Sequence, residues 1–251
     1  MPHTALPIYV ISLTRSPARR AAISAQLAAL GLTFSFIDAI DGARPLPNAA
    51  QAYDREKRLR VYGTELSPHE IGCGLSHVKA CAAIAAGPAR AGVVLEDDVV
   101  LAPDLPAVLD AVAALERPFD IIRLAGKRAR KCKPVQQLAG RQLVRLFGGA
   151  CGTQGYVITG EAARRFIGYA LPMTQQIDIL LDEYYFHGLN TFSVLPHPVR
   201  EDETLPSTIP ARAQGGARHG RALFYRIMPR KWPSDIARFF YHWRHYRLGA
   251  E

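Results

Sequence analysis

The triplet Glu96-Asp97-Asp98 is the part of the sequence best suited to chemistry. It follows residues 92–95, a short apolar run typical of a strand that is buried on both faces. Three carboxylates cannot continue such a strand into the core without a large desolvation cost, so they must lie where the chain reaches the surface. In open α/β sheets, ligands bind at the carboxyl ends of the strands. Adjacent carboxylates repel one another, and their oxygens suit Mg²⁺ or Mn²⁺ bound beside substrate phosphates.

Asp98 is the first candidate for direct metal ligation, and Glu96 is the second. We expect a further ligand from His197 or Glu201, near the end of the last predicted strand. Two alternatives stay open. The triplet also fits an acidic helix start, because carboxylates favour the positive end of a helix dipole and Pro103 follows closely. His197 also fits a loop histidine that binds nothing.

Residues just after the first predicted strand are suited to binding a nucleotide. Arg15 and Arg19 can grip phosphate or stack on a base, and Ser12 and Leu13 would then lie beside the nucleotide. The alternative for both arginines is the solvated first turn of a helix, since most arginines lie on the surface.

Three further residues are expected around the bound ligand. Asp97, like Glu96, can bind ligand hydroxyl groups or orient water on the metal. Ser76 and His77 do not form a Ser/His nucleophile pair, because neighbours in a helix point about 100° apart. We expect them to wall the ligand pocket or to hold their helix against the acidic strand end.

Two further acids are candidates for a general base, a group that takes a proton from a reacting hydroxyl group or water. Asp178 and Asp182 are spaced i, i+4, which places them on one face of a predicted helix. Asp178 is the first candidate and Asp182 the second, and the alternative for both is an exposed helix face. Asp38 and Asp41 are weaker candidates, because acids in turns often bond their own backbone.

A βαβ unit opens the chain and places these residues. Residues 8–13 read as a buried strand, and residues 33–37 read as a second one. Between them, Ser16 can cap a helix whose first position is Pro17 and which ends at Gly31. Because a βαβ crossover joins parallel strands, we expect a mostly parallel central sheet.

The remaining elements continue this α/β pattern. Ser67-Pro68-His69-Glu70 forms a capping box at the start of a helix that reaches about Ala86. Further strands are predicted over residues 91–95, 119–124, 152–159 and 191–195. Further helices are predicted over residues 103–115, from residue 160 onward, and over residues 178–187. Residues 127–133 are predicted to form a basic loop.

Six segments in order resemble glycosyltransferase family 25, the lipopolysaccharide and lipooligosaccharide β-galactosyltransferases. Tyr9-Val10-Ile11-Ser12-Leu13-Thr14-Arg15 is similar to the opening of that family. Gly72-Cys73-Gly74-Leu75-Ser76-His77 resembles its Gly-Cys-x-x-Ser-His helix, and Leu95-Glu96-Asp97-Asp98 resembles its acidic motif. The other similar segments are residues 36–42, 152–158 and 177–182. The agreement in order and spacing extends over residues 7–209.

The resemblance implies a GT-A-like nucleotide-binding fold with an Asp-x-Asp-like metal motif. It further implies a UDP-sugar donor, galactose being the family's commonest sugar, with Mn²⁺ or Mg²⁺ and inversion at the anomeric carbon. The implied acceptor is a lipopolysaccharide, a lipooligosaccharide or a related glycan or glycolipid.

The charge of the chain indicates an anionic partner. Its formal net charge is +9, and residues 211–251 form a basic, aromatic segment that follows a domain over 1–210. Residues 235–246 can form a helix with Ile236, Phe239, Phe240 and Trp243 on one side, as expected of a helix lying on an anionic membrane. The alternative is an aromatic stripe that packs on the catalytic domain. No nucleic acid is expected as a partner.

The expected location is cytoplasmic, peripheral at the inner face of the bacterial inner membrane. No signal peptide and no spanning run of about 18 apolar residues is recognisable, and the four cysteines show no metal-binding spacing, which favours reduced thiols. Two other functional classes stay open. One is a non-enzymatic basic module that binds a membrane or nucleic acid, and the other is a metal-dependent phosphohydrolase.

Overall fold

The computed structural model describes residues 6–46, 48–127, 132–202, 204 and 235–244. Its strands are β1 (Ile8–Ser12), β2 (Ser35–Asp38), β3 (Ala91–Glu96), β4 (Val99–Leu101), β5 (Ile121–Arg123), β6 (Cys132–Leu138), β7 (Arg141–Leu146), β8 (Gly155–Thr159), β9 (Thr191–Leu195) and β10 (Val199–Glu201). Its helices are α1 (Pro17–Ala29), α2 (Ala49–Ala52), α3 (Arg55–Tyr62), α4 (Pro68–Ala86), α5 (Leu105–Ala113), α6 (Gly160–Ala170), α7 (Ile177–Asp182) and α8 (Tyr184–His187).

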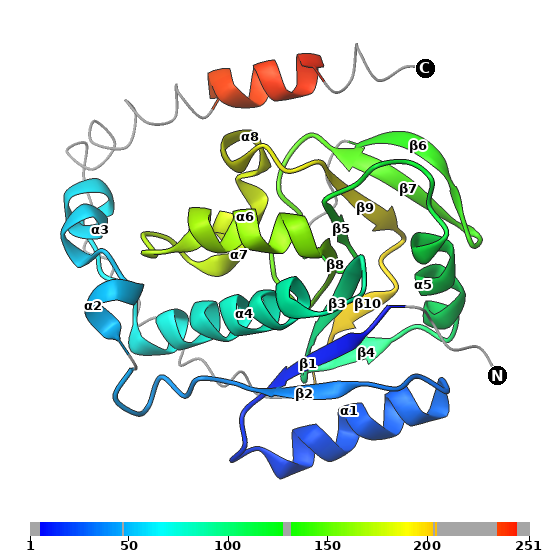
Figure 1. Cartoon of the computed structure of the whole chain (residues 1–251), viewed down its shortest axis with the longest axis horizontal. Coiled ribbons are helices and arrows are strands. Elements are labelled where there is room, and N and C mark those ends of the chain that lie inside the picture. Colours follow the sequence, from blue (N-terminus) through cyan, green and yellow to red (C-terminus); the bar gives the residue numbers. More distant parts are fainter. Residues whose placement is uncertain (1–5, 47, 128–131, 203, 205–234, 245–251) are drawn as a thin grey trace.

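An eight-stranded sheet in the order β2-β1-β3-β8-β5-β9-β7-β6 runs through the molecule (Figure 1). β1 is parallel to both β2 and β3, and β5 is parallel to β9. β8 and β7 run antiparallel to their neighbours, so six of the eight strands share one direction. β4 and β10 form a separate antiparallel pair. The structure therefore confirms the α/β class with a mostly parallel central sheet.

Two apolar cores cover the faces of the sheet. One contains side chains of α1 and α5, and the other contains side chains of α4, α6 and α7. The opening β1-α1-β2 unit has the predicted parallel register, with Val10 beside Phe36. Pro17 lies in the first turn of α1 as expected, but Ser16 makes no side-chain cap hydrogen bond.

Helix α4 begins with the predicted capping box. The Ser67 hydroxyl accepts from the Glu70 amide, and the Glu70 carboxylate accepts from the Ser67 amide. The helix lies tightly against the loop that follows β2, since a Cβ added to Gly72 would lie 2.6 Å from the Ile40 carbonyl oxygen. This close approach brings the middle of α4 to the carboxyl ends of β1 and β3.

Two parts of the chain differ from expectation. The predicted helix 178–187 is two short helices, α7 and α8, that separate at Glu183. The β6–β7 hairpin was not predicted, and it turns at Ala139 and Gly140, both with positive φ. The last two residues of the predicted basic loop, 132 and 133, belong to β6, and its residues 128–131 lie outside the described part.

Residues 235–244 are helical and pack on the domain beside α8 (Figure 1). Tyr241 is buried there, and its hydroxyl donates to the Leu189 carbonyl at 3.0 Å. The proposed domain boundary at 210 and most of the basic segment lie outside the described residues. Within the described part of the chain, no helix is both long and apolar enough to cross a membrane.

Candidate active site

A cavity of about 730 Å³ opens at the carboxyl ends of β1 and β3. Its wall also includes the loop after β2, one side of α4, residues 151–154 before β8, and the start of α7. Twelve predicted site residues line this cavity: Ser12, Leu13, Arg15, Arg19, Asp41, Ser76, His77, Glu96, Asp97, Asp98, Asp178 and Glu201. Three others, Asp38, Asp182 and His197, do not line it. The fold therefore brings together most of the residues singled out from the sequence.

Arg19 and Ser12 hold the acidic triplet in place. Arg19 Nη1 lies 3.2 Å from Asp97 Oδ1 and 3.1 Å from Asp98 Oδ2, and only 11% of the Arg19 side chain is exposed. Ser12 Oγ donates to Asp97 Oδ2 at 2.5 Å. The alternative of a solvated arginine in the first turn of a helix is therefore wrong for Arg19. Its side chain is mostly buried, and it neutralises part of the negative charge at the end of β3.

Asp98 retains one oxygen that these contacts do not satisfy. Its Oδ1 is buried and has no hydrogen-bond partner in the described structure. Burial raises the pKa of the Asp98 carboxyl to about 6, and the nearby carboxylates of Glu96, Asp97 and Glu201 add to the rise while Arg19 opposes it. A cation that binds the unsatisfied oxygen would stabilise the charged form of such a carboxyl group.

Glu96 is held by polar neighbours. Thr153 Oγ1 donates to Glu96 Oε1 at 2.5 Å, and His77 Nε2 lies 3.5 Å from the same oxygen. Burial works against the charged form of Glu96, but His77 and Thr153 outweigh it and keep the pKa of this carboxyl below its usual range. His77 is itself oriented by Tyr156, whose hydroxyl lies 3.1 Å from His77 Nδ1.

Asp178 faces the cavity from the first turn of α7. Its Oδ1 accepts from the Ile179 amide at 2.9 Å, and burial raises the pKa of this carboxyl above its ordinary value. A carboxylate that is short of solvent and faces an open cavity can take up a proton from a bound hydroxyl group.

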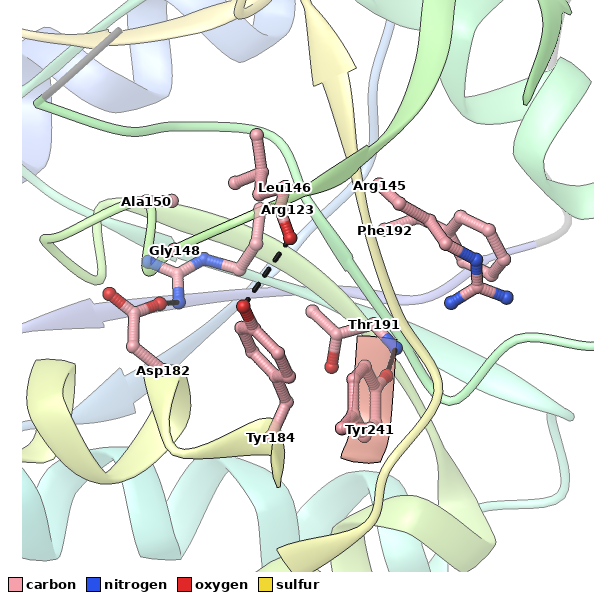
Figure 2. Close-up of a pocket in the computed structure, with 10 residues that line it drawn as sticks. All are labelled: Arg123, Arg145, Leu146, Gly148, Ala150, Asp182, Tyr184, Thr191, Phe192 and Tyr241. Atoms are coloured by element: carbon pink, nitrogen blue, oxygen red, sulfur yellow. Dashed lines mark hydrogen bonds and ion pairs between the residues drawn. The ribbon is translucent and has the colours of Figure 1, made fainter. Parts of the chain in front are cut away.

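Asp182, four residues later, is instead bound to protein groups. Its Oδ1 lies 2.8 Å from Arg123 Nη1, and its Oδ2 accepts from the Cys151 amide at 2.8 Å. Figure 2 shows the Arg123–Asp182 pair. Arg123 also donates to the Gly152 carbonyl. The Arg123–Asp182 pair therefore fixes the cavity wall at Cys151 and Gly152, both of which have positive φ.

His197 and Glu201, the two candidates for a further ligand, are separated by the fold. His197 lies outside the cavity lining, and its Nε2 would lie 2.7 Å from a Cβ added to Gly126. Burial lowers the pKa of His197 to about 4. Glu201 lines the cavity and pairs with Lys127 at 2.7 Å. Of the two, Glu201 is thus the one that lies near Asp98.

The weaker base candidates are paired with arginines. Asp41 binds Arg15 at 2.7 Å, and Asp38 binds Arg20 at 2.5 Å. The hydrogen bond from the arginine lowers the pKa of each carboxyl, which makes each a poorer base than Asp178.

The cysteines are free thiols, as expected. Cys81 is fully buried, and Cys73 packs against the apolar core and also lines the cavity. Among the described residues, no group of three or more His, Cys, Asp or Glu side chains is arranged to hold a metal ion.

Sequence reasoning missed three residues around the cavity. Arg123 is 1% exposed in an otherwise apolar strand, and a charged residue within an apolar run was the available signal. Lys127 lay in the segment interpreted only as a basic loop. Gln154 is uncharged and is not a defining residue of any recognised motif, so no signal in the sequence distinguished it.

Comparison with known proteins identifies the family of the chain. The sequence profile described as "Glycosyltransferase family 25 (LPS biosynthesis protein)" matches residues 5–181. The chain is 26% identical to the lipooligosaccharide biosynthesis protein lic2B of Haemophilus influenzae, over 82% of this chain and 80% of that protein.

Two other relatives show the range of the similarity. The lacto-N-neotetraose biosynthesis glycosyltransferase LgtE of Neisseria gonorrhoeae is 28% identical, over 86% of this chain and 84% of that protein. The inactive glycosyltransferase 25 family member 3 of Mus musculus is 27% identical, over 75% of this chain and 36% of its own length. The profile match spans well over half of the residues, and on this ground the chain belongs to glycosyltransferase family 25.

Proposed function

We propose that this protein is a metal-dependent, inverting glycosyltransferase. The proposed reaction transfers a hexose from a UDP-sugar to a lipopolysaccharide, a lipooligosaccharide or a related glycan. Galactose is the first candidate for the hexose. The bacterial relatives are named for lipooligosaccharide and lacto-N-neotetraose biosynthesis, which supports this class of acceptor. Because the matched relatives include three that are named inactive or probable inactive, the case for turnover is built on the residues of the cavity.

The charge of the cavity carries the proposal. Its lining holds three Lys or Arg side chains against seven Asp or Glu side chains, a formal charge of −4: Arg15, Arg19, Lys127, Asp41, Glu70, Glu96, Asp97, Asp98, Asp178 and Glu201. A diphosphate would be repelled by this surplus of carboxylates. A divalent cation removes the repulsion by binding carboxylate and phosphate oxygens together.

The residues present fit such a cation. Asp98 Oδ1 is a buried oxygen with no hydrogen-bond partner in the described part, and Glu96 and Glu201 lie close enough to raise the Asp98 pKa. Mg²⁺ usually binds one or two carboxylates and takes its other ligands from substrate phosphates and water. A set of three protein ligands is therefore not required. When bound, the cation would stabilise the charge that develops on the departing diphosphate.

The proposed chemistry of the chain's own residues is a single displacement. Asp178 accepts the proton of the acceptor hydroxyl group while the oxygen of that group bonds to the anomeric carbon from the face opposite the diphosphate. The bond between the anomeric carbon and the diphosphate oxygen breaks, and its electron pair leaves with UDP. Arg15 and Arg19 line the same cavity, where each is paired with a carboxylate, and we assign them to the phosphates or the base.

A transfer assay tests the proposal directly. Purified protein is incubated with Mn²⁺, a set of UDP-sugars and truncated lipooligosaccharide, and the glycan product is identified by mass spectrometry. We expect one hexose to be added and UDP to be released in equal amount. Phosphate release from simple esters without sugar transfer would favour the phosphohydrolase alternative. Binding without any turnover would favour the non-enzymatic module.

We further propose that the C-terminal helix contacts an anionic membrane, where a lipid-linked acceptor would lie. Residues 211–251 contain nine Lys or Arg against two Asp or Glu. The helix 235–244 packs on the domain through Tyr241 and His242. Its outer face leaves four large apolar side chains 47–65% exposed: Ile236, Phe239, Phe240 and Trp243. Basic charge beside exposed aromatic side chains is typical of interfacial helices.

Vesicle co-sedimentation tests the membrane proposal. We expect the protein to sediment with vesicles that contain phosphatidylglycerol and to stay in solution with phosphatidylcholine vesicles. The double change Phe239→Ser and Trp243→Ser should abolish sedimentation, whereas Val100→Ser, at an exposed apolar residue of β4, should leave it unchanged. Equal sedimentation of both variants would contradict a role for this helix.

A further inference from the structure

We infer that Gln154 recognises a hydroxyl group of the transferred sugar, and that Gln154, His77 and Glu96 form a hydroxyl-binding subsite in the cavity. The ligand class is the pyranose ring of the donor. The inference rests on the proposed function, because it requires a sugar donor in this cavity.

Gln154 is buried and yet has an unsatisfied acceptor. Its side chain lies on the cavity wall and only 6% of the residue is exposed. Its Oε1 has no hydrogen-bond partner in the described structure. A buried amide oxygen without a partner carries the full desolvation cost of the group, and a bound ligand that donates a hydrogen bond would remove this cost. A sugar hydroxyl can donate to this oxygen.

The backbone of Gln154 is anchored, and its side-chain amide lies against Gly152. The Gln154 carbonyl accepts from the Glu96 amide at 3.0 Å, which anchors the backbone beside the acidic triplet. A Cβ added to Gly152 would collide with Gln154 Oε1, and Gly152 has a φ of +85°. Glycine at position 152 thus provides both the backbone conformation and the space in which the amide lies.

His77 provides a second unsatisfied polar atom next to Glu96. His77 is 1% exposed, and its Nε2 is buried without a hydrogen-bond partner in the described part. It lies 3.5 Å from Glu96 Oε1. Gln154, His77 and Glu96 all line the same cavity, and the three side chains can bind the alternating donors and acceptors of a sugar edge.

The place of this subsite favours the donor sugar over the acceptor. Glu96 precedes Asp98, the proposed cation ligand, by two residues, and the transferred sugar is bonded to the diphosphate that the cation would hold. The acceptor hydroxyl must instead lie near Asp178, which enters the cavity from α7.

Substitution by methionine isolates the hydrogen bond, because Gln154→Met keeps the length of the side chain and removes its polar atoms. The binding of UDP and of UDP-galactose is measured by calorimetry in the presence of Mn²⁺. We expect the variant to bind UDP-galactose about tenfold more weakly than the wild type and to bind UDP within twofold of it. Gln142→Met, at an exposed residue of β7, is the matched control and should change neither affinity.

Thermal unfolding separates recognition from a structural role. Removing an unsatisfied buried acceptor should leave the Tm of Gln154→Met unchanged or raise it, whereas a structural glutamine would lower it. Equal weakening of UDP and UDP-galactose, unchanged binding of both, or an effect on the acceptor KM alone would each overturn the inference.

Deoxy-sugar donors test the subsite without any substitution. The affinities of UDP-galactose analogues that each lack one hydroxyl group are compared with that of UDP-galactose. For one analogue, the wild type should bind the analogue about tenfold more weakly than UDP-galactose, whereas Gln154→Met should bind the analogue and UDP-galactose with equal affinity. Uniform binding of all analogues to the wild type would overturn the inference. Failure of the wild type to bind any UDP-sugar would instead refute the proposed function, so the two failures are distinguishable.

Discussion

Asp178 and Asp182 lie four residues apart on one short helix, and changing each to asparagine should have opposite effects. Asp182 pairs with Arg123 at 2.8 Å, and the two side chains are 15% and 1% exposed. Removing one partner of a buried ion pair costs about 3–5 kcal/mol. Asparagine keeps one acceptor oxygen, so we expect a loss of about 3 kcal/mol, or a fall in Tm of about 6–12 °C for a chain of this length.

Asp178→Asn should instead preserve stability and abolish turnover. Burial raises the pKa of Asp178, so the folded protein binds this proton more tightly than the unfolded chain does. Above the ordinary carboxyl pKa, the charged form therefore lowers stability, and a neutral amide should keep or raise the Tm at pH 8. Loss of a general base typically slows catalysis by about 10²–10⁴-fold.

The assay combines thermal unfolding with initial rates of sugar transfer at pH 8, and Asp235→Asn on the exposed C-terminal helix is the control. We expect Asp182→Asn to melt early but to keep measurable turnover below its Tm. A wild-type Tm for Asp182→Asn would refute the structural role of the Arg123–Asp182 pair. Full turnover by Asp178→Asn, with none by Asp182→Asn, would reverse the assignment of the base.

Three further outcomes are expected. Gly152→Ala should lower stability by about 1–2 kcal/mol, since its φ of +85° disfavours a side chain, and should weaken UDP-sugar binding by displacing Gln154; calorimetry checks both. Tyr241→Phe removes the hydrogen bonds to Leu189 and Thr191, so limited proteolysis should release the C-terminal helix faster. The acid limb of kcat/KM should lie above the ordinary carboxyl pKa, because the base form of Asp178 is lost as pH falls through its raised pKa; a pH–rate profile checks this.

Local signals made part of the fold predictable. The apolar run of β1 and the capping box of Ser67 and Glu70 depend on near neighbours in the chain, and both elements lie where they were expected. The division of one predicted helix at Glu183 and the β6–β7 hairpin depend on packing against distant segments. No local pattern reports such packing.

The candidate site follows the same distinction. The acidic triplet was recognisable because carboxylates end an apolar strand, a pattern contained in consecutive residues. The pairing of Arg19 with Asp97 joins residues that are 78 positions apart, and the Arg123–Asp182 pair spans 59 positions. The i, i+4 spacing of Asp178 and Asp182 predicts only that both lie on one face of a helix. It could not show that Asp178 faces the cavity and that Asp182 faces Arg123.

UDP binding with and without a divalent cation tests the central claim most directly. The account predicts that Mn²⁺ tightens the binding of UDP by at least about tenfold, because it offsets the negative charge of the cavity. Asp98→Asn should remove most of this gain without unfolding the protein. Equal affinity for UDP in Mn²⁺ and in a chelator, or an undiminished Mn²⁺ effect in Asp98→Asn, would contradict the account.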